Sequence, residues 1–176
     1  PVEIENACQG AEISIEYKDG EQIVLLNKEN VNAFLRTEEV GNMASVSSAN
    51  PEVRKRLLDL QRKLAKSMSV VMDGRDIGTT ILPDADVKIY LTASPLTRAK
   101  RRCLELEEKG VSCDLAQIQK DIEERDRRDM NREISPLKKA EDAVLVDSSD
   151  MTIDEVVKNI LQIYREKVIN SKKRAE

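Results

Sequence analysis

The residues best suited to chemistry lie in one short stretch, Ser69 to Thr80, which reads SVVMDGRDIGTT. Its charged residues stand among glycines, in the order Asp73, Gly74, Arg75, Asp76 and Gly78. Glycine lets a backbone approach a ligand closely or adopt a positive φ, and charged side chains in such a turn are typical of a ligand site. The alternative is a tight turn with an internal Asp/Arg pair.

The segment in front of this turn predicts a strand. Val70, Val71 and Met72 form an apolar run that is too short for a helix and is followed closely by a glycine, so we expect a buried strand. Open α/β sheets bind their ligands beyond the carboxyl ends of their strands. The charged turn is therefore expected at the ligand-binding edge of a sheet.

A second group of charged residues lies in the segment ERDRRDMNR. Arg125, Arg128 and Arg132 stand at positions i, i+3 and i+7, so on a helix they share one face, with Asp129 beside them. Guanidinium groups match phosphate oxygens, and this face could therefore clamp phosphates. The alternative is a solvated face on which neighbouring acids balance the arginines.

Two further residues could contact a nucleotide, Arg54 as another source of a guanidinium and Asp76 as a reader of the base. Arg54 stands early in a helix predicted to begin at Pro51, and a carboxylate such as Asp76 can accept a hydrogen bond from the exocyclic amine of cytosine. Together with the arginines of the other segments, these residues suit a nucleotide with several phosphates.

The composition limits the classes of function. The chain has 176 residues, enough for one domain with a core, and only 2% of them are aromatic. A net charge of −4 and few aromatic rings for base stacking argue against an RNA-binding protein and against membrane binding by charge. No apolar run approaches the roughly 18 residues of a membrane helix. We expect a monomer that binds neither membranes nor nucleic-acid polymers.

The three cysteines, Cys8, Cys103 and Cys113, form no CxxC pair, and the sequence has no histidine. A structural zinc site is therefore not expected. An odd, scattered set of cysteines without a secretory leader predicts reduced thiols and a cytoplasmic protein.

The elements that position these residues alternate between strands and helices. The predicted strands are a hairpin over residues 11–27 with its turn at Asp19 and Gly20, and single strands at 87–91 and 143–147. The predicted helices begin at Pro51 after the cap Asn50, at Pro95 after the cap Ser94, at Asp114 and at Thr152. A short helix over 31–35 and a loop or loose helix over 42–50 are less defined, and residues 1–6 carry no signal. This alternation predicts an α/β fold with a parallel sheet.

Several long blocks, taken in order, resemble bacterial cytidylate kinases. GRDIGT is followed by PDADVKIYLTAS, by RAKRR in the next helix, and by ERDRRDMNR before SPLKKAEDAVLVDSS. Upstream, LLNKENVNAFLRTEEVGNMASVSSANPEVRKRLLDLQRKLA also matches. The resemblance covers about Gly10 to Val168, and it is specific because the blocks stand in the family's order.

The resemblance implies an enzyme that transfers the terminal phosphoryl group of ATP to CMP or dCMP, with Mg²⁺. It implies the three-layer, parallel-sheet α/β fold of the P-loop nucleoside monophosphate kinases, in a single kinase domain over residues 1–176. Within that domain, the family has a small β-containing CMP-binding lobe, here at about 8–50, and a helical lid, here at about 114–136.

The resemblance also implies roles for individual residues. The residues that match cytosine-reading positions are Ser45, Arg54 and Asp76. The residues that match phosphate-binding or nucleotide-binding positions are Arg75 for the CMP phosphate, Arg125 and Asp129 for the acceptor nucleotide, and Arg132 for the transferring phosphates. The expected catalytic residues are Arg75, Arg125 and Arg132. Asp73 matches an acidic residue that interacts with the magnesium ion through a water molecule.

The sequence departs from the family in one respect. None of its six glycines stands in a GxxxxGK[ST] motif, the loop that cradles the ATP phosphates and holds magnesium. The family opens with a strand, this loop and a helix, so the central strand is also expected to be missing. We expect such a segment within roughly 60 residues before Pro1. The alternative is a fragment that binds CMP without catalysing phosphoryl transfer.

Overall fold

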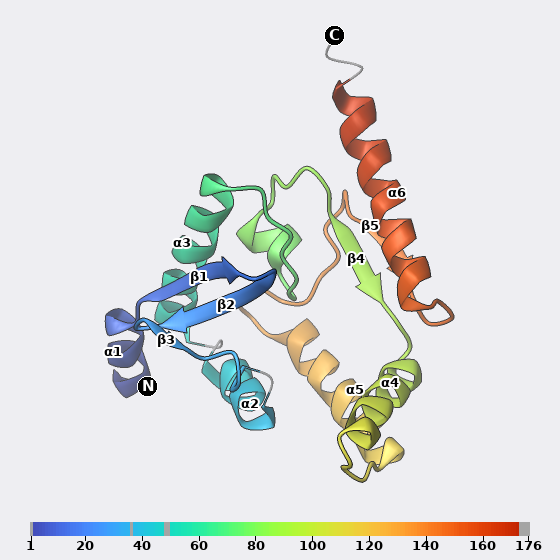
Figure 1. The fold of residues 1–176 in the computed structure, drawn as a ribbon, viewed down its shortest axis with the longest axis horizontal. Helices are drawn as coiled ribbons and strands as arrows, with labels where there is room; N and C mark the ends of the chain where they lie inside the picture. The colour runs from blue at the N-terminus through green and yellow to red at the C-terminus, as the bar shows by residue number, and fades with distance from the viewer. Residues whose placement is uncertain (1, 36, 48–49, 173–176) are drawn as a thin grey trace. The chain divides into compact units, whose positions relative to one another are not determined.

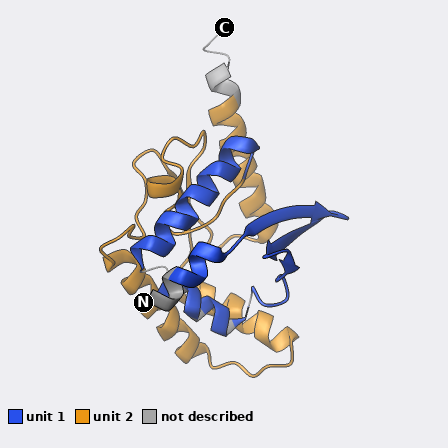
Figure 2. Cartoon of the chain, turned by 90° about the vertical axis from the view of Figure 1, so that its left-hand side faces the viewer, with its two compact units in different colours: residues 1–70 blue, residues 71–176 orange. Residues whose placement is uncertain are grey.

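The computed structural model describes residues 2–35, 37–47 and 50–172, and the side chain of Ser45 lies outside this description. The chain divides into two compact units, residues 1–70 and residues 71–176 (Figure 2). The charged turn at Asp73 and all later candidate residues belong to the second unit. Their geometry can therefore be described within one unit.

The first unit contains a three-stranded antiparallel sheet (Figure 1). β1 (Ile13–Lys18) pairs with β2 (Glu21–Leu26), and β2 pairs with the short β3 (Glu29–Asn30). Asp19 and Gly20 connect β1 to β2 with φ values of 55° and 82°, as a two-residue hairpin turn requires. The predicted hairpin is confirmed, whereas β3 was not predicted.

The helices of the first unit are α1 (Val2–Gly10), α2 (Glu38–Ser47) and α3 (Pro51–Ser67). Asn50 caps α3 as predicted, because its side chain accepts hydrogen bonds from two backbone amides of the first turn. The sequence carried no signal for α1, which packs against α3. The expected helix over 31–35 is wrong, since residues 32–35 form a turn.

The second unit contains a two-stranded parallel sheet. β4 (Ile89–Thr92) pairs with β5 (Val144–Asp147) in a register that places Ile89 opposite Val144. The connection between them runs through α4 (Pro95–Glu108) and α5 (Leu115–Asn131), which pack against each other. The predicted parallel sheet is confirmed, and the crossover length is typical of parallel strands.

The final helix, α6 (Ile153–Lys172), begins with a capping box. The Thr152 hydroxyl accepts from the Glu155 amide, and the Glu155 carboxylate accepts from the Thr152 amide at 2.8 Å. The Thr152 hydroxyl also donates to this carboxylate at 2.9 Å, and the hydrogen bonds from the Thr152 amide and hydroxyl lower the pKa of Glu155. The cap predicted at Thr152 is confirmed. None of the helices in the described part of the chain combines the length and apolarity needed to span a bilayer.

The buried strand expected at Val70 to Met72 is wrong. No strand ladder includes these residues, and Val71 is fully exposed, at 103% of its reference area. A strand needs a neighbouring backbone that accepts and donates its hydrogen bonds. No described segment pairs with this run, so its β-branched composition alone does not make a strand.

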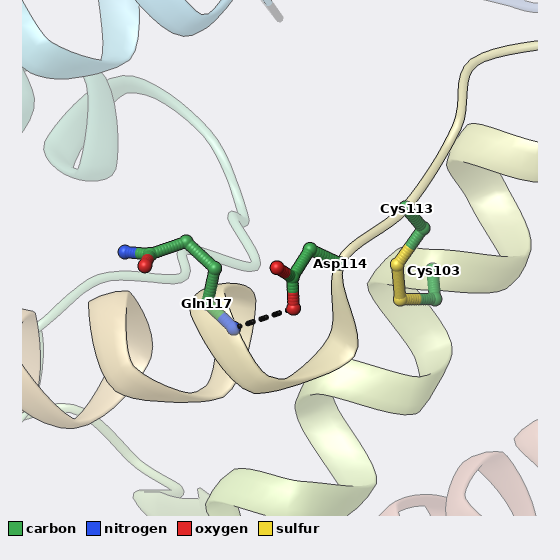
Figure 3. The surroundings of a disulfide bond; sticks show 4 residues. All are labelled: Cys103, Cys113, Asp114 and Gln117. Atoms are coloured by element: carbon green, nitrogen blue, oxygen red, sulfur yellow. Dashed lines mark hydrogen bonds between the residues drawn. A yellow bond between two sulfur atoms is a disulfide. The ribbon is translucent and has the colours of Figure 1, made fainter.

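Local signals define both ends of the α4–α5 connection. Ser94 caps α4 as predicted, and α4 ends at Glu108, two residues before Gly110, whose φ of 73° favours glycine. Asp114 caps α5 as predicted, because its carboxylate accepts from the Gln117 amide at 3.1 Å (Figure 3). These signals fix where α5 begins, and α5 carries the second group of candidate residues.

A disulfide joins Cys103 in α4 to Cys113 in the connection (Figure 3). The two Cα atoms lie 5.4 Å apart, within the range that a disulfide spans. The expectation that all three cysteines are reduced is therefore wrong for this pair. Sequence spacing could not reveal the contact, because it depends on α4 packing against the start of α5.

We predict that the cap of α5 stabilises the second unit. Asp114→Ala removes the acceptor for the Gln117 amide and should lower the free energy of unfolding by about 1 kcal/mol. Asp114→Asn is the matched control and should retain most of the stability, because asparagine caps as well as aspartate. Urea unfolding followed by circular dichroism measures both. Equal stabilities for the two variants would contradict the capping role.

Candidate functional site

The turn that carries the first candidate residues is followed by a π-helix, η1 (Ile77–Ile81). The carbonyl of Asp76 accepts hydrogen bonds from the amides of Thr80 at 2.9 Å and Ile81 at 3.3 Å. π-Helical turns occur often at functional sites. Here the turn holds Asp76 in a buried position, with 8% of the residue exposed.

The glycines of this turn allow close packing and do not adopt a positive φ. A Cβ atom on Gly74 would lie 2.9 Å from the Ile77 side chain, and one on Gly78 would lie 3.3 Å from the Lys88 side chain. Gly20 and Gly110 are the glycines with positive φ in the described residues. The expected positive φ is therefore wrong for both glycines, and the close approach that the structure shows is to the protein's own side chains.

Arg75 and Asp129 form an ion pair that joins the turn to the last turn of α5. Arg75 Nε donates to Asp129 Oδ2 at 2.8 Å, and Asp129 is 9% exposed. The Arg75 side chain keeps 41% of its area exposed. Its two terminal nitrogens make no hydrogen bond to the described residues. Arg75 can thus hold Asp129 and still offer donors to an anion.

Arg132 and Asp76 form a second ion pair between the end of α5 and the turn. Its Nη2 lies 3.8 Å from Asp76 Oδ1, and its Nε donates to the Ser135 carbonyl at 2.5 Å. Nη2 is buried and has no hydrogen-bond acceptor among the described residues. Buried polar atoms normally have a partner, so this donor has hydrogen-bonding capacity that the described residues leave unused.

The prediction that Arg125, Arg128 and Arg132 share a helix face is wrong for Arg132. α5 ends at Asn131, and Arg132 is its C-cap in an extended conformation. The charge cluster therefore combines Arg75 and Asp76 from the turn with Asp129 and Arg132 from the end of α5. Two positive and two negative groups alternate, which lets each buried carboxylate face a guanidinium.

Arg125 and Arg128 remain on the exposed surface of α5. Neither forms an ion pair with any residue that the structure describes. Arg125 lies one helical turn before Asp129, so its side chain is on the same side of α5 as the cluster. Its guanidinium can therefore reach a ligand on that side of α5 without breaking a salt bridge to a described residue.

Other arginines of the second unit are structural. Arg98 Nη2 contacts Asp126 Oδ2 at 2.6 Å and Arg98 Nε donates to the Ala93 carbonyl, so α5 is tied to the end of β4. Arg101 donates to the Ser148 carbonyl after β5 at 2.6 Å. In the sequence these residues belong to the segment RAKRR, and only the fold reveals their internal acceptors.

Sequence reasoning also missed Ser135, whose carbonyl accepts from Arg132 Nε. Ser135 has a positive φ of 51°, which is uncommon for a residue other than glycine. The only signal was its place before Pro136, since the residue before a proline avoids the helical region. The strained backbone there turns the carbonyl toward Arg132.

Two carboxylates near the parallel sheet have lowered pKa values. The Lys88 ammonium donates a hydrogen bond to Asp142 and lowers the pKa of that carboxyl group. Ser149 donates through its hydroxyl and its amide to Asp147, at the end of β5, and lowers its pKa as well. Both groups are therefore carboxylates at neutral pH.

The remaining candidates lie elsewhere. Arg54 is in the first turn of α3, in the first unit, as predicted. Ser45 lies in α2, and its side chain is outside the described residues. Asp73 is exposed in the turn. No group of three or more His, Cys, Asp or Glu side chains suited to a metal ion occurs within residues 2–35, 37–47 and 50–172.

We predict that Arg75 and Asp129 are energetically coupled. In a double-mutant cycle by urea unfolding, Arg75→Ala and Asp129→Ala should show a coupling of about 1 kcal/mol. A larger value is not expected, because solvent screens the exposed part of Arg75. Arg127→Ala is the control, since Arg127 is exposed on α5 and forms no ion pair with a described residue. Additive effects of Arg75→Ala and Asp129→Ala would show that the contact contributes nothing.

Comparisons with known proteins identify similar chains. The family model for cytidylate kinase matches residues 2–166. The chain is 48% identical over 165 residues to a cytidylate kinase of Lactobacillus johnsonii, which covers 94% of this chain and 72% of that relative. It is 51% identical over 159 residues to one of Lactobacillus gasseri, which covers 89% and 69%. It is 46% identical over 169 residues to one of Caldicellulosiruptor bescii, which covers 96% and 74%.

Proposed function

The chain belongs to the cytidylate kinase family, and from this premise we propose that it phosphorylates CMP or dCMP with ATP. It is an ATP-dependent phosphotransferase, and its nucleotide substrates follow from the names of its relatives. The products are CDP or dCDP and ADP.

The observation that carries the proposal is the buried Nη2 of Arg132, which lacks an acceptor in the described residues. It lies beside Asp76 and on the same cluster as Arg75, whose terminal nitrogens are also unused. Three guanidinium nitrogens without acceptors match the oxygens of phosphoryl groups in charge and geometry. We assign Arg75 to the acceptor phosphate and Arg132 to the transferred phosphoryl group.

Recognition of cytosine is assigned to Asp76, with Arg54 and Ser45 in support. A carboxylate accepts from the exocyclic amine of cytosine and repels the carbonyl oxygen that uracil presents at the same position. Asp76 is buried, so water competes poorly for its oxygens. Arg54 supplies donors for the acceptor edge of the base.

Phosphoryl transfer needs little covalent help from the protein, so positioning and charge stabilisation carry the catalysis. Arg75, Arg125 and Arg132 neutralise charge that builds on the transferred group. Arg125 has no ion pair among the described residues, so it can move onto the phosphates, and Asp129 orients the acceptor nucleotide together with Arg75. Closure of the lid over residues 114–136 then excludes water, which otherwise competes as acceptor.

Magnesium is assigned to Asp73. A single exposed carboxylate fits this ion, because Mg²⁺ keeps several waters and binds through one or two carboxylates and the substrate phosphates. When bound, the ion neutralises phosphate charge. The protein's part here is the carboxylate of Asp73, which acts through an intervening water.

We assign the chain to the three-layer P-loop nucleoside monophosphate kinase fold, with the CMP lobe at about 8–50. The parallel β4–β5 pair supports this assignment. The 176 residues contain no GxxxxGK[ST] loop, the motif that cradles the ATP phosphates in kinases of this fold. We also propose that the protein acts as a monomer in the cytoplasm.

The first functional prediction separates binding from turnover. In calorimetric titrations the 176-residue chain should bind CMP saturably and ATP poorly, because the residues above contact CMP while the ATP phosphate loop is absent. In a coupled ADP-release assay it should show no turnover. The same chain preceded by a strand, a GxxxxGK[ST] loop and a helix should be active.

The control is the same extended chain with the loop lysine replaced by alanine, which should bind CMP normally and lose turnover. Saturable CMP binding without turnover in every extended chain would favour a fragment that only binds CMP. Absence of CMP binding in all of them would reject the assigned site.

The second functional prediction concerns Asp76. Asp76→Asn offers both a donor and an acceptor at nearly the same volume, so it removes the discrimination against uracil. In the extended, active chain, kcat/KM for CMP should fall and the CMP/UMP ratio should narrow by about 10-fold to 100-fold, since one polar base contact is worth about 1 to 3 kcal/mol. Arg75→Ala is the matched control and should weaken CMP and UMP alike, because they share the phosphate. An unchanged CMP/UMP ratio in Asp76→Asn would remove Asp76 as the base-reading residue.

A further inference from the structure

The packed pair of α4 and α5 is fastened at both ends by different bonds. At the start of α4, Arg98 contacts Asp126 near the end of α5 at 2.6 Å. In the second half of α4, Cys103 is joined by the disulfide to Cys113, just before α5 begins. The first bond joins charged side chains and does not respond to redox conditions. The second is covalent and can be opened by a thiol reductant.

The disulfide lies directly before the first turn of α5 (Figure 3). Cys103 is buried against the helix pair, at 8% exposure, whereas Cys113 in the connection is more accessible. Asp114, the next residue, caps α5 through the Gln117 amide. The bond therefore fastens the point at which α5 begins.

Hydrogen bonds also hold the connection between α4 and α5 in place, independently of the disulfide. Val111 N donates to the Leu106 carbonyl at 2.9 Å, and Gly110 N donates to the Glu107 carbonyl at 2.9 Å, which closes the end of α4. The Asp114 cap closes the start of α5. Because these hydrogen bonds and the packing of α4 on α5 do not involve the sulfur atoms, we expect the unit to stay folded in both redox states.

We propose that Cys103 and Cys113 form a reversible thiol–disulfide modification site that controls how firmly the start of α5 is held, and thereby the affinity for nucleotide. The second part rests on the proposed function. α5 is one uninterrupted helix from Leu115 to Asn131, so a looser start changes the freedom of Asp129 and of the following Arg132 at its other end. In the oxidised form the site residues at the end of α5 have less conformational entropy to lose on binding. The oxidised form therefore binds nucleotide more tightly.

The exchange balances with a dithiol as the co-reactant. A thiolate of the dithiol attacks the accessible Cys113 sulfur, the S–S bond breaks, and Cys103 leaves as a thiolate that takes up a proton. The second thiol of the reductant then attacks the reductant's other sulfur, which is bonded to Cys113 in the mixed disulfide. This step releases Cys113, which is also protonated. Two electrons and two protons pass to the protein, and the dithiol becomes a disulfide. Oxidation reverses both steps.

A reversible role fits the cysteine content better than a permanent staple does. Two of the three cysteines pair and Cys8 is free, and the pair spans only ten positions of a chain with a helical and sheet framework of its own. Disulfides in cytoplasmic proteins are usually transient and redox-sensing. The position of the pair beside the helix that carries site residues makes such a response useful.

The test compares the 176-residue chain after equilibration with a disulfide oxidant and with a dithiol. Alkylation with iodoacetamide under denaturing conditions, followed by mass spectrometry, should add one label to the oxidised chain and three to the reduced chain. Reduction should lower the melting temperature by roughly 5 °C or more, because it frees a loop of about ten residues. Calorimetric titration should give a CMP Kd about fivefold higher in the reduced chain.

The controls use the cysteines themselves. The double variant Cys103→Ser/Cys113→Ser should behave like the reduced chain in both buffers, and Cys8→Ser should respond to redox conditions like the unmodified chain. Reduction of the unmodified chain requires no substitution, so the test holds even if the double variant does not fold.

Three labels in both buffers, or equal melting temperatures, would overturn the modification site. A shift in melting temperature with an unchanged CMP Kd would overturn its control of nucleotide affinity. Absence of CMP binding in both states would instead contradict the proposed function, and the melting data would still decide whether the thiol–disulfide site exists.

Discussion

The candidate site depends on ion pairing between two arginines and two aspartates, namely Arg75 with Asp129 and Arg132 with Asp76. Asp76 and Asp129 are buried, and a buried carboxylate is tolerated only when a guanidinium or another donor faces it. Each of the two segments supplies one acid and one base. The turn and the end of α5 are therefore held together by the same residues that would bind nucleotide. A bound nucleotide would have to contact these residues while their ion pairs stay intact.

The helix pair α4–α5 carries that constraint to the rest of the second unit. Arg98 ties α5 to the end of β4, and Arg101 ties α4 to the segment after β5. The polar end of the parallel sheet and the charge cluster are therefore linked through arginines whose acceptors are mostly backbone carbonyls.

Local features were read correctly from the sequence because they depend on neighbouring residues. Side chains at Asn50, Ser94 and Asp114 can cap only the helix that follows them, and the Asp19–Gly20 turn can close only the hairpin around it. The alternation of such elements also indicated a parallel sheet. The family, and with it the reaction, followed from long blocks in a fixed order, which the comparisons confirmed.

Contacts between distant segments were decided by the tertiary structure alone. The Arg75–Asp129 pair joins residues 54 positions apart, and Cys103 meets Cys113 only because α4 and α5 pack together. Conversely, Val70 to Met72 have the composition of a strand and form none, since no described segment offers a partner backbone. By itself, the sequence determined which residue types were available, where helices begin, and which family the chain resembles. Only the fold decided which charges meet, because that depends on partners that spacing along the chain does not specify.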